Sequence, residues 1–139
     1  MKNSEGDYFT RQLIQEKYCH DPFKMLVGCI MLNQTNNKQV WEVVENFFNR
    51  FPSPESITED SFSEIREITR TLGFYNRRSN QIIKFSNDWL NKPFKRVSEL
   101  YGIGKYAEDS YEIFVNGNLN VNPTDKVLLK YLRLNGIDI

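Results

Sequence analysis

The apolar residues of this 139-residue chain recur with the period of an α-helix, and this spacing restricts the fold more than any other feature. In 37–50 the apolar positions i, i+3, i+4, i+7 and i+8 are Val40, Val43, Val44, Phe47 and Phe48. They form one stripe, which predicts a helix that buries this face in a core. No segment sustains the alternation typical of a strand. The same spacing predicts helices at about residues 7–18, 22–33, 37–50, 61–71, 76–91, 105–116 and 124–134.

Prolines and glycines mark where these helices should begin and end. The prolines stand near expected helix starts or loop bends, and the glycines stand at expected breaks. They are Pro22, Pro52, Pro54, Pro123, Gly73, Gly102, Gly104 and Gly117. Because the connections are short, we expect one compact all-α domain over residues 1–139, without repeats or linkers.

The composition excludes several classes of protein. Cys19 and Cys29 do not form a C-x-x-C pair, and with the single His20 they cannot complete a zinc site or ligate an ordinary iron–sulfur cluster. We expect two buried thiols, with no zinc and no cluster. The amino terminus lacks the apolar run of a signal peptide, and the longest apolar stretch, MLVGCIML, is too short to cross a bilayer. These features predict a soluble intracellular protein, in cytoplasm and nucleoid or in a nucleus, with no membrane partner.

Charge is distributed unevenly along a chain whose formal net charge is zero. Residues 61–106 contain nine Lys or Arg residues and four acids, whereas the flanking segments are net acidic. A local excess of this kind is typical of a surface that binds a polyanion, and equally of ordinary solvated helix surfaces.

The segment LYGIGKY, residues 100–106, places two glycines directly before a predicted helix. No strand precedes it, which excludes the dinucleotide-binding interpretation of Gly-x-Gly. A glycine turn leading into a helix exposes backbone N–H groups that can hold an anion such as a DNA phosphate, and the helix dipole reinforces them. The alternative is a glycine corner between helices that serves packing only.

About twenty residues after this hairpin, VNPTDK places Asp125 behind a proline at the start of the last predicted helix. The hairpin and this turn occur in order with HDPFK, LNQT, LGFYNRR and YGIGKYAEDSY. Together, over about residues 15–131, they resemble the helix-hairpin-helix DNA glycosylase superfamily. Within it they look most similar to the mismatch thymine/uracil glycosylase domain found in methyl-CpG-binding-domain proteins.

The resemblance implies a two-lobed helical domain with a cleft between the hairpin and the turn that bears Asp125. It also implies a base-excision repair enzyme that acts as a monomer on double-stranded DNA. Such an enzyme rotates a mismatched thymine or uracil, here opposite guanine, out of the stack and hydrolyses its bond to the sugar.

The same resemblance assigns the residues that grip DNA. The hairpin, about residues 97–110, implies phosphate contacts from the backbone of Gly102, Ile103, Gly104 and Lys105. It also implies a monovalent cation, Na⁺ or K⁺, on the carbonyls of Ser98, Leu100 and Ile103, with no other cofactor required. The resemblance also implies that Gln34 and Phe74 insert into the duplex. The Gln34 amide would hydrogen-bond to base edges, and the Phe74 ring would act as an apolar wedge. Arg77 and Arg78 are expected at phosphates.

The resemblance implies that Asp125 is the catalytic residue. Loss of the base leaves a positively charged sugar, which a carboxylate stabilises, and the carboxylate can also orient or deprotonate water. Tyr106 stands where bifunctional members have a lysine that forms a Schiff base with the sugar. This departure implies a monofunctional glycosylase in which Tyr106 contacts the flipped base. Gln15, aligned with a pyrimidine-contacting glutamine, would read the edge of that base.

Three alternatives remain at this point. Asp125 taken alone is as well explained by capping the amino terminus of a helix. The chain could be a catalytically silent module that binds damaged DNA, keeping hairpin and wedge. It could also be a bifunctional glycosylase and lyase that uses Lys105 or Lys126.

Overall fold

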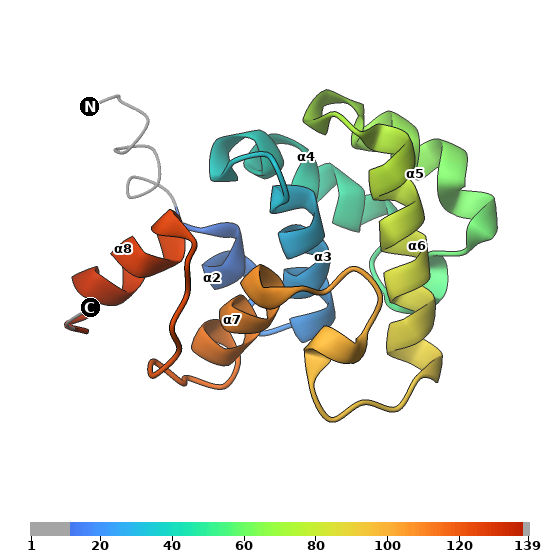
Figure 1. The fold of residues 1–139 in the computed structure, drawn as a ribbon. Helices are drawn as coiled ribbons and strands as arrows, with labels where there is room; N and C mark the ends of the chain where they lie inside the picture. The colour runs from blue at the N-terminus through green and yellow to red at the C-terminus, as the bar shows by residue number, and fades with distance from the viewer. Residues whose placement is uncertain (1–11, 138–139) are drawn as a thin grey trace.

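The computed structural model describes residues 12–137, and within that range every regular element is helical and no strand occurs (Figure 1), which confirms the all-α prediction. The α-helices are α2 (Ile14–Tyr18), α3 (Pro22–Leu32), α4 (Asn37–Arg50), α5 (Phe62–Ile68), α6 (Tyr75–Asn91), α7 (Lys105–Phe114) and α8 (Lys126–Leu134). The short 3-10 turns are η1 (Pro54–Ser56), η2 (Glu59–Ser61), η3 (Arg70–Leu72) and η4 (Val97–Glu99).

Two predicted helices differ from the structure. Residues 7–11 of the first lie outside the described residues, and its remainder is the short α2. The helix predicted at 61–71 divides, because the Thr69 hydroxyl donates a hydrogen bond to the Ile65 carbonyl at 2.8 Å and the backbone then tightens into η3. Side chains of this kind compete with the helical hydrogen-bond ladder.

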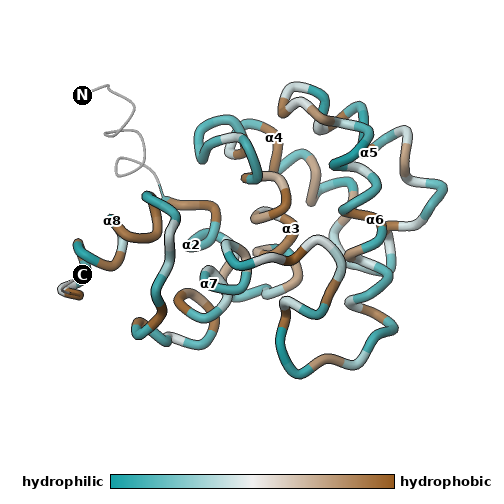
Figure 2. The backbone as a smooth tube through the Cα atoms, viewed as in Figure 1, coloured by the Kyte–Doolittle hydropathy of each residue, from teal (hydrophilic) through white to brown (hydrophobic). Residues whose placement is uncertain are grey.

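Helix α3 lies in the middle of the molecule and is buried on all sides. Eight of its eleven residues are buried, so no face of it is left for solvent. It contacts α2, α4, α6 and α7, and Figure 2 shows hydrophobic residues along it where these helices surround it. A helix that is apolar all round must be enclosed by others, which explains this arrangement.

The ends of α3 and α4 follow from local sequence. Asp21 accepts a hydrogen bond from the Lys24 amide at 3.2 Å, and Pro22 supplies the first residue of α3. Asn36 and Gln39 form a reciprocal capping box at the start of α4. These caps fix where α3 and α4 begin.

Helix α2 packs closely on α3 because position 28 is glycine. A Cβ atom placed on Gly28 would lie 2.6 Å from Cγ2 of Ile14, closer than real Cβ contacts allow. The buried Asn37 side chain also holds α2, since its Oδ1 accepts from the Ile14 amide at 2.8 Å and its Nδ2 donates to the Gln12 carbonyl at 3.1 Å. Glycine at 28 and asparagine at 37 thus set the position of α2.

Helix α8 packs on α7 through a second, smaller apolar cluster. Its buried members are Ile113, Leu128 and Leu132, and the Phe114 and Tyr131 rings meet at 4.7 Å between centroids. This packing fixes the turn before α8. None of the helices in residues 12–137 is long and apolar enough to cross a membrane. The division into two lobes stays a prediction.

Replacing Gly28 by valine should destabilise the fold. The added side chain cannot fit against Ile14 without moving α2, and overpacking of this kind costs about 2 kcal/mol of unfolding free energy. Chemical denaturation followed by circular dichroism measures the change. Asn46→Val, at an exposed site within α4, controls for the helix propensity of valine and should shift stability by about 0.5 kcal/mol or less. Equal losses in both variants would contradict the packing explanation.

Candidate active site

Asp125 stands at the amino terminus of α8, where its side chain caps the helix. Its Oδ2 accepts a hydrogen bond from the Leu128 amide at 3.0 Å, and its own backbone is extended. Capping and a role in a pocket do not exclude each other, because a carboxylate has two oxygens with about four lone-pair positions. The cap orients the carboxylate.

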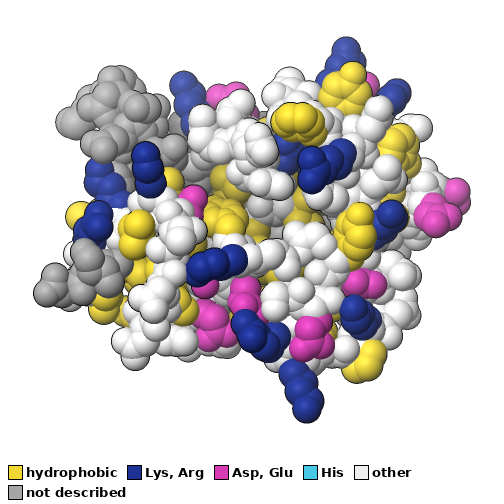
Figure 3. Space-filling model, viewed as in Figure 1, with side chains coloured by type: hydrophobic (Ala, Val, Ile, Leu, Met, Phe, Trp, Pro, Cys, Tyr) yellow, Lys and Arg dark blue, Asp and Glu magenta, His cyan; other side chains and the backbone are white. Residues whose placement is uncertain are grey.

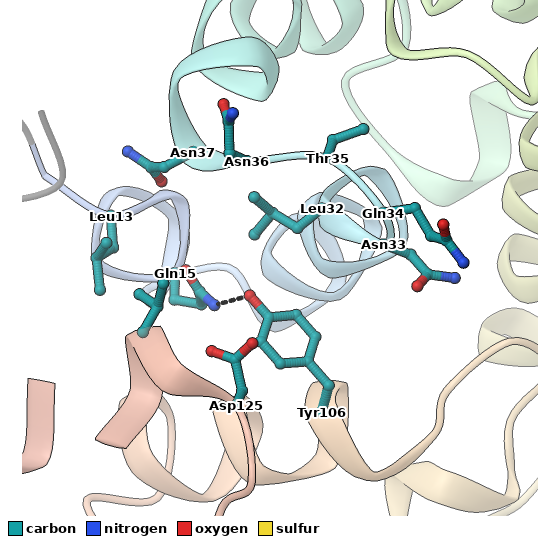
Figure 4. A pocket seen from close by; sticks show the side chains of 11 residues that line it. Leu13, Gln15, Leu32, Asn33, Gln34, Thr35, Asn36, Asn37, Tyr106 and Asp125 are labelled. Atoms are coloured by element: carbon teal, nitrogen blue, oxygen red, sulfur yellow. Dashed lines mark hydrogen bonds between the residues drawn. The ribbon is translucent and has the colours of Figure 1, made fainter. Parts of the chain in front are cut away.

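Asp125 lines a cavity of about 280 Å³ together with residues from four other parts of the chain. The lining residues are Leu13, Gln15, Leu32, Asn33, Gln34, Thr35, Asn36, Asn37, Tyr106, Asp125 and Val127. Figure 4 shows Gln15, Tyr106 and Asp125 pointing toward one another from α2, α7 and the start of α8. Small-molecule sites run from roughly 300 to 1,000 Å³, so a cavity at the bottom of that range suits one small ring.

Gln15 is buried at the floor of this pocket, with 1% of its surface exposed. Its Nε2 donates to the Tyr106 hydroxyl at 2.7 Å (Figure 4) and to the Ser110 hydroxyl at 3.3 Å. A buried amide is costly without partners, and these two acceptors use both of its N–H groups. The Gln15 carbonyl oxygen is thereby the group that remains for a ligand. No sequence pattern pointed to Ser110, which lies one helical turn after Tyr106.

Cys29 lies beneath the same pocket and is fully buried. The pKa of its thiol is raised to about 12, chiefly by burial; a hydrogen bond with Ser110 acts to lower it, and the negative charge of Asp125 acts to raise it. The thiol is therefore neutral near pH 7 and is not an activated nucleophile. Its burial agrees with the prediction, whereas Cys19 is only partly buried.

The two lysines considered for lyase chemistry are absent from the described lining of the pocket. Lys105 Nζ donates to Asp109 Oδ2 at 2.7 Å and to the Asn122 carbonyl at 2.7 Å. These contacts hold Lys105 against the segment before α8. Lys126 follows Asp125 but does not line the pocket either. A phosphate contact by Lys105 stays a prediction.

Gln34 and Phe74, 40 positions apart, lie together beside the pocket. Both line a small hollow that also includes Arg77 and Gln81. Gln34 is exposed, and Phe74 exposes 61% of its surface, the kind of large apolar side chain in water that calls for an explanation. Figure 4 shows the Gln34 side chain turned away from Asp125.

The prediction that Arg78 contacts a phosphate is wrong. Only 3% of its surface is exposed, and its guanidinium donates to main-chain carbonyls inside the protein. Burial lowers the pKa of Arg78, with a further contribution from the neighbouring charge of Arg77. Arg77 itself is exposed at the rim of the hollow. Sequence alone could not separate two adjacent arginines on a helix, of which one faces inward.

The two hairpin glycines have different reasons to be glycine. Gly102 has φ 80°, a conformation that favours glycine, whereas Gly104 is extended with φ −99°. A Cβ atom on Gly104 would meet nothing within 4 Å. Gly104 is also the N-cap of α7 and has no side chain to cap it. Nothing in the described fold therefore requires glycine at 104, and open space adjoins the first amides of α7. Ile103 between them is buried.

The carbonyls predicted to hold a monovalent cation lie within the hairpin, on η4 and the turn that follows it. Leu100 ends η4, and its carbonyl accepts the Ile103 amide at 3.2 Å, which leaves one lone pair available. Ser98 hydrogen-bonds to Glu108, which lowers the pKa of that carboxyl after the larger effect of Arg96. Carbonyl oxygens of this kind fit a hard cation, and a cation there stays a prediction.

The count of nine bases in 61–106 overstates the positive surface. Arg96 pairs with Glu108 at 2.6 Å, Lys105 pairs with Asp109, and Arg78 is buried. On the face seen in Figure 3, Lys and Arg side chains are scattered among acidic and uncharged ones rather than gathered in one patch. On this face, binding of a polyanion would depend on particular residues more than on a concentration of positive charge.

The chain belongs to the HhH-GPD superfamily of base excision DNA repair proteins, whose sequence model matches residues 27–130. The match includes Gln34, Phe74, the hairpin and Asp125. It agrees with the family resemblance found in the sequence.

The chain is similar to several DNA glycosylases and related proteins. A methyl-CpG-binding domain protein 4-like protein of Arabidopsis thaliana is 37% identical over 120 residues, covering 86% of this chain and 27% of the relative. A thymine/uracil-DNA glycosylase of Pyrobaculum aerophilum is 32% identical over 94 residues, covering 63% and 41%. The solved structure of a thermostable thymine-DNA glycosylase shares the fold, with a TM-score of 0.68, 21% identity, and coverage of 92% of this chain and 71% of that one. The chain thus spans well under half the length of these two sequence relatives.

Proposed function

We propose that this chain is a monofunctional DNA glycosylase that removes thymine or uracil opposite guanine from double-stranded DNA. The observation that carries the proposal is the convergence of Asp125, Gln15 and Tyr106 on one pocket whose rim includes Gln34. Family membership supports the reaction class, and the similarity to a thymine/uracil-DNA glycosylase supports the pyrimidine substrate.

Gln15 and Tyr106 would select the base. Both N–H groups of the Gln15 amide are held by Tyr106 and Ser110, so its carbonyl oxygen presents an acceptor to the pocket. Thymine and uracil carry an N3–H donor that suits this acceptor. Cytosine presents an acceptor at the same position, and two acceptors facing each other in a buried site would leave both unpaired. This polarity supports thymine or uracil as substrate.

Asp125 would act on the sugar. Departure of the base leaves positive charge on the anomeric carbon, and a fixed carboxylate beside it stabilises that charge more in the transition state than in the ground state. The hydrogen bond from the Leu128 amide to Oδ2 orients the group and leaves Oδ1 to face the sugar or a water. With Tyr106 where a Schiff-base lysine would stand, water is the proposed nucleophile, so the strand is left intact.

The duplex would be held and opened by the surrounding surface. The open space over Gly104 lets a phosphate approach the first amides of α7, with Arg77 and Lys105 contributing charge and a cation on the hairpin carbonyls completing the grip. Gln34 and Phe74 would enter the space vacated by the flipped base. A protein that binds this way needs no second copy, so we propose that it acts as a monomer.

Excision on defined duplexes tests the proposed activity. Purified protein is incubated with duplexes carrying G·T or G·U, and the strands are analysed with and without hot alkali. We expect scission only after alkali, because a monofunctional enzyme leaves an intact strand with a missing base. Scission without alkali would show a lyase acting through a lysine such as Lys105 or Lys126. No scission in either arm would indicate a binding module.

Asp125→Asn separates catalysis from capping. Asparagine caps helices as well as aspartate does, so stability should hold, while the lost charge should raise the barrier by about 3 kcal/mol, roughly a hundredfold in single-turnover rate. DNA affinity should be equal or higher. The matched control is Asp21→Asn, the same change at the cap of α3 outside the pocket, which should excise normally. Wild-type rates for Asp125→Asn would show that Asp125 is not catalytic.

Substitution of Gly104 tests the hairpin. Gly104 has an ordinary φ and empty space around it, so Gly104→Ala and Gly104→Val should fold. The expected loss of unfolding free energy is about 1 kcal/mol, because alanine and valine are poorer N-cap residues than glycine. A side chain at position 104 would block the approach of a phosphate. Affinity for duplex DNA should therefore fall from the parent to Gly104→Ala and further to Gly104→Val, by roughly tenfold or more for the valine variant. Fluorescence anisotropy over a range of salt measures this. Equal affinity in all three would make the hairpin a packing corner.

A further inference from the structure

The two residues proposed to enter DNA share an uncommon backbone conformation. Gln34 has φ 63° and Phe74 has φ 46°, and no other non-glycine residue in 12–137 has a positive φ. In this region the Cβ atom crowds the backbone, so such residues persist only where surrounding structure holds them. Both strained residues lie at the hollow beside the pocket.

Arg78 is bonded to the backbone next to both of them. Its Nη1 donates to the Asn33 carbonyl at 3.0 Å, and its Nε donates to the Gly73 carbonyl at 3.2 Å. Each carbonyl belongs to the peptide group directly before a strained residue, and rotation relative to that peptide plane is what φ measures. One planar guanidinium thus fixes the orientation of both peptide planes.

Further hydrogen bonds anchor this guanidinium. Nη1 also donates to the carbonyls of Ile30 at 2.9 Å and Met31 at 3.2 Å, and Nη2 donates to the carbonyl of Leu72 at 3.3 Å. Ile30 and Met31 lie in the last turn of α3, where the helix dipole favours a cation, and their carbonyls also accept hydrogen bonds from the Asn33 amide and the Thr35 hydroxyl. These carbonyls compensate the buried charge of Arg78, and they tie the end of α3 to the start of α6.

We propose that Arg78 is a positioning residue that holds Gln34 and Phe74 in their strained conformations, side by side, so that both enter the duplex together. Arg78 is 3% exposed and lies in the wall of the hollow with Gln34 and Phe74, so its effect on DNA is expected to pass through these two residues. It does not line the pocket of Asp125 and Gln15, so it serves the opening of the duplex and not the hydrolytic step. The assignment of Gln34 and Phe74 as insertion residues rests on the proposed function.

Arg78→Lys tests the proposal, because lysine keeps the charge but replaces the planar fork with a single ammonium that cannot hold both peptide groups in the same geometry. Arg78→Gln is the second variant, to be used if lysine prevents folding. Arg50→Lys is the matched control, since Arg50 is exposed, pairs with Glu64 and lies outside the site. Near-ultraviolet circular dichroism and thermal melting are measured for each variant, and the assays are run at a temperature at which every protein is folded.

Single-turnover excision is compared on two substrates that differ only in how firmly the target is stacked. One carries uracil opposite guanine, and the other carries uracil opposite an abasic-site analogue. The single-turnover rate of Arg78→Lys should fall by roughly tenfold or more on the paired substrate and by less than about threefold on the unpaired one. The rate of Arg50→Lys should be unchanged on both substrates. Equal losses on both substrates would indicate general damage to the pocket and overturn the proposal, as would no loss on either.

A binding measurement that needs no excision separates this inference from the proposed function. In an Asp125→Asn background, 2-aminopurine next to a G·U pair should brighten when the protein unstacks the duplex, and Arg78→Lys should abolish the increase. If the wild type excises nothing yet this pattern holds, the proposed activity fails and the role of Arg78 stands. An increase of equal size with Arg78→Lys, or no increase with Arg78 intact, would overturn that role.

Discussion

The enclosure of α3 is the constraint on which the rest of the structure depends. Because this helix is apolar on every side, α2, α4, α6 and α7 must pack around it. That packing brings Gln15 and Tyr106, 91 positions apart, within hydrogen-bonding distance. Gly28 lets α2, which carries Gln15, approach α3 closely, since a Cβ atom at position 28 would clash with Ile14.

The polar groups around the carboxyl end of α3 depend on the same enclosure. The chain leaves the helix at Asn33, and the last carbonyls of α3 cannot continue the i to i+4 hydrogen-bond ladder. The Asn33 amide bonds to the Ile30 carbonyl and the Thr35 hydroxyl bonds to the Met31 carbonyl. The guanidinium of Arg78 donates to both carbonyls as well, and it joins the loop of Gln34 to the start of α6. Asn37 performs a similar task at the start of α2. Satisfying buried backbone thus determines which residues reach the surface beside the pocket.

Patterns that act over short distances were readable in the sequence. The apolar stripe of 37–50 predicts α4 with its observed bounds, and LYGIGKY with Asp125 indicates the family. Contacts between distant residues were not readable. The inward direction of Arg78, the pairing of Lys105 with Asp109 and the contact of Ser110 with Gln15 depend on which helix face meets which neighbour. The break at Thr69 came from one hydroxyl that competes with the helix.

The most direct test of the account is a crystal structure of Asp125→Asn bound to a duplex containing a G·U pair. In this complex we expect uracil outside the stack and inside the cavity of about 280 Å³, with the Gln15 carbonyl oxygen accepting its N3–H. Gln34 and Phe74 would occupy the vacated position in the duplex, and Gly104 would lie against a phosphate. A complex in which uracil remains stacked, or in which the DNA lies on another face of the protein, would contradict it.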